Sequence, residues 1–70
     1  MDLVKVDSSM IYAVGYDPET RTLEVVFNRT GVYVYEGVPQ EVYDGLLAAD
    51  SKGSYMRDYI IDMYPTRKLK

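Results

Sequence analysis

Tyrosine supplies most of the side chains in this sequence that are suited to molecular recognition. Eight of the nine aromatic residues are tyrosine and one is phenylalanine. Tyr33 and Tyr35 stand two residues apart, a spacing that places both rings on one face of a β-strand. Two such rings on a sheet can stack unpaired nucleobases. The alternative is that both rings belong to the core and only their hydroxyls reach its rim.

Three basic residues are candidates to contact phosphate beside such a stacking platform: Arg29, Lys52 and Arg57. Lys52 lies within Ser51-Lys52-Gly53, at the expected start of a helix, where backbone N–H groups can hold a small anion. The same residues also fit a helix cap followed by a glycine chosen for close packing. The candidate binding residues are therefore Arg29, Tyr33, Tyr35, Ser51, Lys52, Gly53 and Arg57.

Residue types that serve catalysis and metal binding are scarce. The chain has no histidine and no cysteine, which removes the commonest general base and the usual ligands of structural zinc. Two acidic pairs, Glu41/Asp44 and Asp58/Asp62, have helical spacing. We interpret them as solvated helix surface, with an acid–base or metal pair as the alternative. We predict a protein that is not an enzyme and that carries no metal or cofactor.

The chain is short and unevenly charged. It has 70 residues and a formal net charge of −3. Residues 1–64 hold all eleven acidic and five of the eight basic residues, so only the last six residues attract phosphate. We predict one domain over residues 1–64 and a solvated basic tail over residues 65–70. No signal-peptide pattern and no apolar run of membrane-spanning length occurs, which predicts a cytoplasmic location.

Three segments alternate apolar and polar residues with a period of two, namely Met10–Tyr16, Thr22–Asn28 and Val32–Glu36. Short turns join them, so we predict a three-stranded antiparallel meander. Pro18 favours a type I turn, and Gly31 is suited to a positive φ. The expected register pairs Tyr12 with Phe27, Val14 with Val25, Phe27 with Tyr33 and Val25 with Tyr35. It places the large rings on one face, and a one-residue slip would turn a strand over.

Two helices are expected after the meander. The first begins at Pro39, and its Gly45 indicates a close contact at that point. The second is capped by Ser51 and ends at Pro65, with one continuous apolar face. The predicted fold class is α+β, with both helices packed on the ring-bearing face of the sheet. The opposite face then exposes Ile11, Ala13, Val26, Val32 and Val34, which predicts a homodimer or a protein partner at this patch.

A series of residues in a fixed order covers about three quarters of the chain. They are Ser9, Leu23, Val25, Phe27, Gly31, Tyr33-Val34-Tyr35, Val38-Pro39 and Ser51-Lys52-Gly53 before Tyr55. With this order, Ser8–Ile60 resembles the KTSC domain, a family named for its place at the C-terminus of some lysyl-tRNA synthetases and also found as free-standing bacterial and viral proteins. Met56-Arg57 departs from the family, in which another aromatic residue and asparagine are usual.

The resemblance implies a binding role, with RNA suggested by the attachment of the family to a synthetase. Our leading hypothesis is a binding module for RNA or single-stranded nucleic acid, in which Tyr33 and Tyr35 stack and the three cations contact phosphate. The alternative is a protein-interaction or self-assembly module that uses the apolar sheet face. Salt should weaken the first kind of binding steeply and the second very little.

Overall fold

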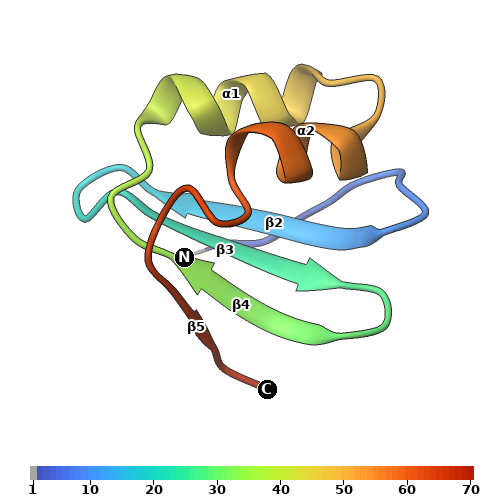
Figure 1. The fold of residues 1–70 in the computed structure, drawn as a ribbon, viewed down its shortest axis with the longest axis horizontal. Coiled ribbons are helices and arrows are strands. Elements are labelled where there is room, and N and C mark those ends of the chain that lie inside the picture. The colour runs from blue at the N-terminus through green and yellow to red at the C-terminus, as the bar shows by residue number, and fades with distance from the viewer. Residues whose placement is uncertain (1) are drawn as a thin grey trace.

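The computed structural model describes residues 2–70 as an antiparallel sheet with two helices over one of its faces (Figure 1). The strands and helices follow in the order β1 (Val4–Lys5), β2 (Ile11–Asp17), β3 (Thr22–Phe27), β4 (Gly31–Tyr35), α1 (Gln40–Ala48), α2 (Lys52–Tyr59) and β5 (Thr66–Lys68). The strands lie in the sheet in the same order as in the sequence. The predicted α+β class is confirmed, but the sheet has five strands rather than three.

The fifth strand forms from the segment that we expected to be a solvated tail. Thr66 Oγ1 donates a hydrogen bond to the Val34 carbonyl at 2.8 Å, and the Val32 amide donates to the Lys70 carbonyl at 3.0 Å. Gly31 has a φ of 107°, and a Cβ at this position would overlap the Lys70 carbonyl oxygen. The positive φ was predicted for the turn, and the close backbone approach is a second reason for glycine.

The hairpin of β2 and β3 has the predicted register over most of its length, including Val14 opposite Val25. A bulge between Ile11 and Ala13 then shifts the pairing by one residue, so Ile11 rather than Tyr12 lies opposite Phe27. Ile11 is fully buried in the core, whereas Tyr12 is half-exposed. The prediction was therefore wrong for both residues, because a bulge reverses the facing of every residue beyond it.

The hairpin of β3 and β4 is shifted by two residues from the expected register. Val25 lies opposite Tyr33, Leu23 lies opposite Tyr35, and Phe27 lies opposite Gly31. A shift of two leaves every side chain on its predicted face, because side chains alternate with a period of two. Tyr33 and Tyr35 consequently lie on the helix side of the sheet, as expected.

Both helices differ from the expected ones at their ends. Helix α1 begins one residue later than predicted, with Pro39 in the N-cap position. Helix α2 is capped by Ser51 as predicted but ends at Tyr59, and the following turn gives Asp62 a φ of 66°. Asp58 and Asp62 therefore do not share a helix face. No helix within residues 2–70 is long and apolar enough to cross a membrane.

The core lies between the helices and the inner sheet face. Its fully buried side chains are Ile11, Val14, Leu23, Val25, Val38, Leu46, Met56 and Ile60. Gly45 of α1 contacts Tyr55 of α2 so closely that a Cβ would overlap the Tyr55 hydroxyl, which confirms the predicted close packing. That hydroxyl donates to the Val42 carbonyl at 2.9 Å and joins the two helices.

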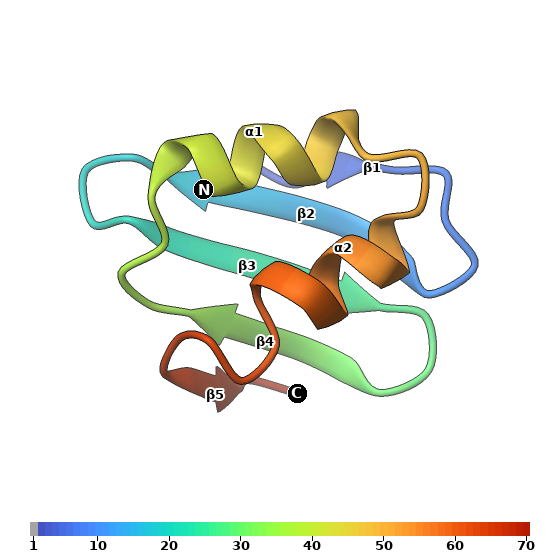
Figure 2. The ribbon, with the colours of Figure 1, turned by 45° about the horizontal axis from the view of Figure 1, so that its top comes forward.

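In the part of the chain that the structure describes, no helix lies over the outer face of the sheet (Figure 2). Of the five apolar residues predicted there, Ile11 belongs to the core instead, and Ala13 and Val34 are buried by their neighbours. Val26 and Val32 lie opposite each other and are half-buried. The outer apolar patch is therefore smaller than the sequence indicated.

Candidate functional site

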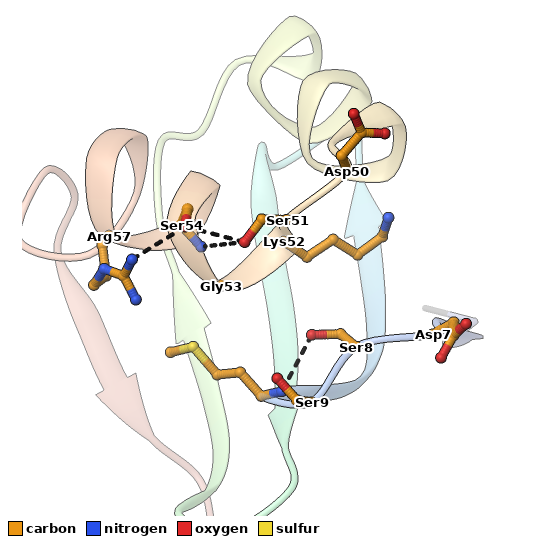
Figure 3. A pocket seen from close by; sticks show the side chains of 10 residues that line it. Asp7, Ser8, Ser9, Asp50, Ser51, Lys52, Gly53, Ser54 and Arg57 are labelled. Carbon is orange, nitrogen blue, oxygen red and sulfur yellow. Dashed lines mark hydrogen bonds between the residues drawn. The ribbon is translucent and has the colours of Figure 1, made fainter.

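A polar cleft of about 340 Å³ lies where the start of α2 meets the loop between β1 and β2 (Figure 3). It is lined by Asp7, Ser8, Ser9, Met10, Asp50, Ser51, Lys52, Gly53, Ser54 and Arg57. Four of the predicted binding residues, Ser51 to Gly53 and Arg57, therefore share one cleft. The cleft is mainly polar because serine hydroxyls and charged groups from both segments converge on it.

Hydrogen bonds hold the two walls of this cleft in place. Ser8 Oγ accepts from the Met10 and Ile11 amides, each at 3.2 Å, and so shapes the turn that enters β2. On the other wall, Ser51 Oγ accepts from the Ser54 amide at 3.3 Å and caps α2. An Arg57 guanidinium nitrogen donates to Ser54 Oγ at 3.1 Å. The hydroxyls of Ser51 and Ser54 thus organise the wall as well as line it.

Gly53 lets the first turn of α2 approach the loop before β2. A Cβ at this position would come within 3.1 Å of the Met10 sulfur, closer than most such contacts. The predicted close packing of this glycine is therefore present, and its partner is Met10. A larger residue here would require the Met10 side chain to shift.

The charges of the cleft are mixed. Lys52 Nζ donates to the Ala49 carbonyl at 3.0 Å, and its side chain runs away from Arg57 toward the end of α1 (Figure 3). Asp7 and Asp50 also line the cleft, so two carboxylates balance its two cations. Arg57 is exposed and is the cation best placed to reach a ligand.

Two further hollows adjoin the cleft through Met10, which lines all three. The second, of about 200 Å³, is lined by Ser9, Met10, Phe27, Arg29 and Thr30. The third, of about 280 Å³, is lined by Met10, Phe27, Thr30, Tyr33, Tyr35, Ile61, Asp62 and Thr66. We call these three neighbouring hollows the α2-end groove. It runs from the start of α2 past the β3–β4 turn to β5.

The two tyrosines of the predicted platform have different environments in this groove. Tyr35 is 4% exposed, and its burial raises the pKa of its hydroxyl, so its ring offers no free face for stacking. Tyr33 is half-buried and meets Phe27 edge-on, with ring centroids 5.5 Å apart. Lys68 Nζ lies 5.9 Å from the centroid of the Tyr33 ring. Tyr33 is thus the accessible member of the pair, and it has a cation beside it.

The family model that describes the KTSC domain matches residues 7–64 of this chain. This chain belongs to the KTSC domain family. The match includes both walls of the polar cleft and the strands β2, β3 and β4. Strand β5, which completes the sheet beside β4, lies beyond the matched residues.

Relatives of this KTSC domain occur as small proteins and as segments of larger ones. An uncharacterised protein of Stutzerimonas stutzeri is 47% identical over 55 residues, which cover 79% of this chain and 78% of that protein. A lysine–tRNA ligase of Nostoc sp. is 36% identical over 67 residues, 96% of this chain but 12% of the ligase. The crystal structure of a KTSC domain protein from Yersinia pestis is 36% identical, with a TM-score of 0.97 and coverage of 99% of this chain and 97% of that one.

The structure brings six of the seven predicted residues of this KTSC domain to accessible positions along the α2-end groove. Arg29 lines the second hollow and Tyr33 the third. Tyr35 also lines the third hollow but is only 4% exposed. The sequence reasoning did not include Met10, which lines all three hollows, or Lys68, which it had assigned to the tail. The period-two pattern of the strands does not extend to Lys68, so no local signal pointed to its position.

Proposed function

We propose that this KTSC domain binds single-stranded RNA along the α2-end groove. The observation that carries the proposal is the arrangement of Arg57, Arg29 and Tyr33 along three neighbouring hollows that share Met10, with Lys68 beside Tyr33. Cations of this kind contact the phosphate backbone of a single strand, while an aromatic ring stacks on a base. In this arrangement Tyr33 supplies the ring, and Tyr35 supports it from the core.

The distribution of ion pairs supports phosphate contact at this groove. The ion pair found within residues 2–70 joins Arg67 to Glu36 at 3.6 Å, on side chains that are well exposed. Arg29, Arg57 and Lys68 have no carboxylate partner in this part of the chain. Cations without a partner retain their charge for a ligand and lose no ion pair when it binds.

The relatives give a second, independent support. A lysine–tRNA ligase acts on transfer RNA, and the Nostoc ligase carries a segment similar to nearly all of this chain. The body of this chain is acidic, however, and Asp7 and Asp50 lie in the groove. The binding that we propose is therefore weak at physiological salt and strongest at low ionic strength.

Fluorescence anisotropy with a labelled RNA of about ten nucleotides tests this proposal. Three phosphate contacts predict that log Kobs falls against log salt with a slope of about −2. Arg57→Gln should lower the magnitude of that slope by about 0.7. Arg21→Gln is the matched control, because Arg21 lies in the β2–β3 turn at the other end of the sheet. Absence of salt-dependent binding, or equal effects of the two variants, would contradict the proposal.

A second candidate function is self-association through the outer sheet face. The observation in its favour is that this face has no helix over it while Val26 and Val32 lie opposite each other on it. Tyr12 and Leu69 are about half-exposed nearby. Sedimentation at several salt concentrations separates the two candidates. A dimer that persists at high salt and is lost in Val26→Lys supports this second function, and a monomer under all conditions contradicts it.

A further inference from the structure

The third hollow of the α2-end groove differs in chemistry from the rest of the groove. Its walls are apolar, from the rings of Phe27 and Tyr33, the thioether of Met10 and the side chain of Ile61. Asp62, Thr66 and Tyr35 add polar groups to its lining. Apolar walls with a few polar groups are typical of sites for small ligands.

Asp62 is the group in this hollow that is able to select a ligand. The turn after α2 places it there, with the Met63 amide donating to the Ile60 carbonyl at 3.0 Å and Asp62 at a φ of 66°. Burial is the main cause that raises the pKa of Tyr35, and the Asp62 carboxylate adds to this shift. Asp62 itself is exposed, and a carboxylate offers hydrogen-bond acceptors only.

Thr66 is already engaged within the protein, because its hydroxyl donates to the Val34 carbonyl at 2.8 Å. Lys68, in the same strand as Thr66, lies with its Nζ 5.9 Å from the centroid of the Tyr33 ring. A ligand that fits this pattern is flat, presents hydrogen-bond donors to a carboxylate and carries a negative charge near Lys68.

Among the nucleobases, guanine fits this pattern best. Its Watson–Crick edge presents two adjacent donors, N1–H and the N2 amino group, which match the two oxygens of a carboxylate. On the corresponding edges of adenine and cytosine, a ring nitrogen acceptor stands beside the amino donor and would face a carboxylate oxygen. Uracil has a single N–H between two carbonyl oxygens. In a single strand these edges are free to be read.

We propose that the third hollow binds one guanine base of a single-stranded RNA, with its Watson–Crick edge on Asp62 and its ring beside Tyr33 and Phe27. This inference rests on the proposed function and adds a base preference to it. The 5′ or 3′ phosphate of the bound nucleotide lies near Lys68. The basic groups at the other end of the groove contact backbone alone and read no sequence.

Three labelled RNA pentamers test the preference: all uridine, or uridine with one central guanosine or adenosine. At low salt we expect the guanosine pentamer to bind about tenfold more tightly than the other two, the value of one bidentate base contact. Asp62→Asn should abolish this difference, because an amide presents one donor and one acceptor. Asp58→Asn removes the same charge from an exposed position of α2 and should keep the difference.

The control separates base recognition from electrostatics. Removing either carboxylate should strengthen binding of the uridine pentamer to a similar, small extent, since each change lowers repulsion of phosphate. Salt-dependent binding of all three pentamers without a guanosine preference would overturn the base pocket and leave the proposed function standing. A guanosine preference that survives in Asp62→Asn would also overturn it. Failure of every pentamer to bind would overturn both.

Discussion

The two ends of the sheet use the same residue types in opposite ways. At the end where β2 turns into β3, Tyr16 stacks on Tyr43 with ring centroids 4.9 Å apart, and its hydroxyl donates to the Val38 carbonyl. At the other end, Tyr33 and Phe27 stand beside neighbouring hollows that share Met10. Rings close the core at the first end and border an open groove at the second.

The connection between β4 and α1 accounts for the difference. It crosses the sheet at the first end, where Val38 is fully buried and its amide donates to the Arg21 carbonyl at 2.9 Å (Figure 2). Burial raises the pKa of the Tyr43 hydroxyl there, and the Asp44 carboxylate adds to the shift. Within residues 2–70 no such connection crosses the second end, where the start of α2 meets the β1–β2 loop and the β3–β4 turn. Rings without a covering segment remain available to a ligand.

The largest change in the free energy of unfolding that we expect is at α1, the helix that closes the first end. Leu46 is fully buried on α1, so Leu46→Ala should lower the free energy of unfolding by about 2–5 kcal/mol. Leu47→Ala is the matched control on the neighbouring exposed position and should change it by less than about 0.5 kcal/mol. Urea denaturation measures both. Equal losses would show that α1 does not close the core in this way.

An intermediate difference between a variant and its control is expected where β5 borders the open groove. Gly31→Ala places a Cβ against the Lys70 carbonyl, whereas Gly37→Ala shares the positive φ but meets no atom within 4 Å. The control, Gly37→Ala, should lower the free energy of unfolding by roughly 1–2 kcal/mol through its backbone conformation alone. Gly31→Ala should lower it by on the order of 1–3 kcal/mol more. It should also speed hydrogen exchange at the Val32 amide, and unchanged exchange would mean that β5 is not held as described.

The smallest expected difference in the free energy of unfolding is between variants of two tyrosines, one at each end of the sheet. Tyr16→Phe leaves the Val38 carbonyl without its donor and should lower the free energy of unfolding by about 1–2 kcal/mol. Tyr33→Phe should cost less than about 0.5 kcal/mol, because the structure shows no hydrogen bond from that hydroxyl within residues 2–70. Thermal denaturation of both variants checks the difference. A greater loss in Tyr33→Phe would reverse our assignment of the closed and open ends.

Local patterns predicted much of the fold and part of the site. The alternation in β2, β3 and β4 identified the inner sheet face, and it survived a two-residue error in register because the facing repeats every two residues. The bulge at Tyr12 was not predictable in this way. An extra residue in one strand leaves no mark in the alternation before it, and only the burial of Ile11 shows where it falls.

The candidate site, too, was predicted in part by local sequence patterns and in part not. Ser51-Lys52-Gly53 was predicted as the start of a helix, and the cap of α2 confirms it. The sequence alone did not distinguish Tyr33 from Tyr35, since both have the same spacing and the same facing. Their difference comes from the turn after α2 and from β5, which reach the sheet from far along the chain.

The sequence by itself determined the class of the fold, the side of the sheet on which Tyr33 and Tyr35 lie and the cap of α2 at Ser51, because these depend on spacing and on backbone preferences within a few residues. The tertiary structure decided which end of the sheet stays open, which tyrosine is accessible and where Lys68 and Asp62 lie. Those outcomes depend on contacts between segments distant in sequence, and such contacts leave no periodic signal in either segment.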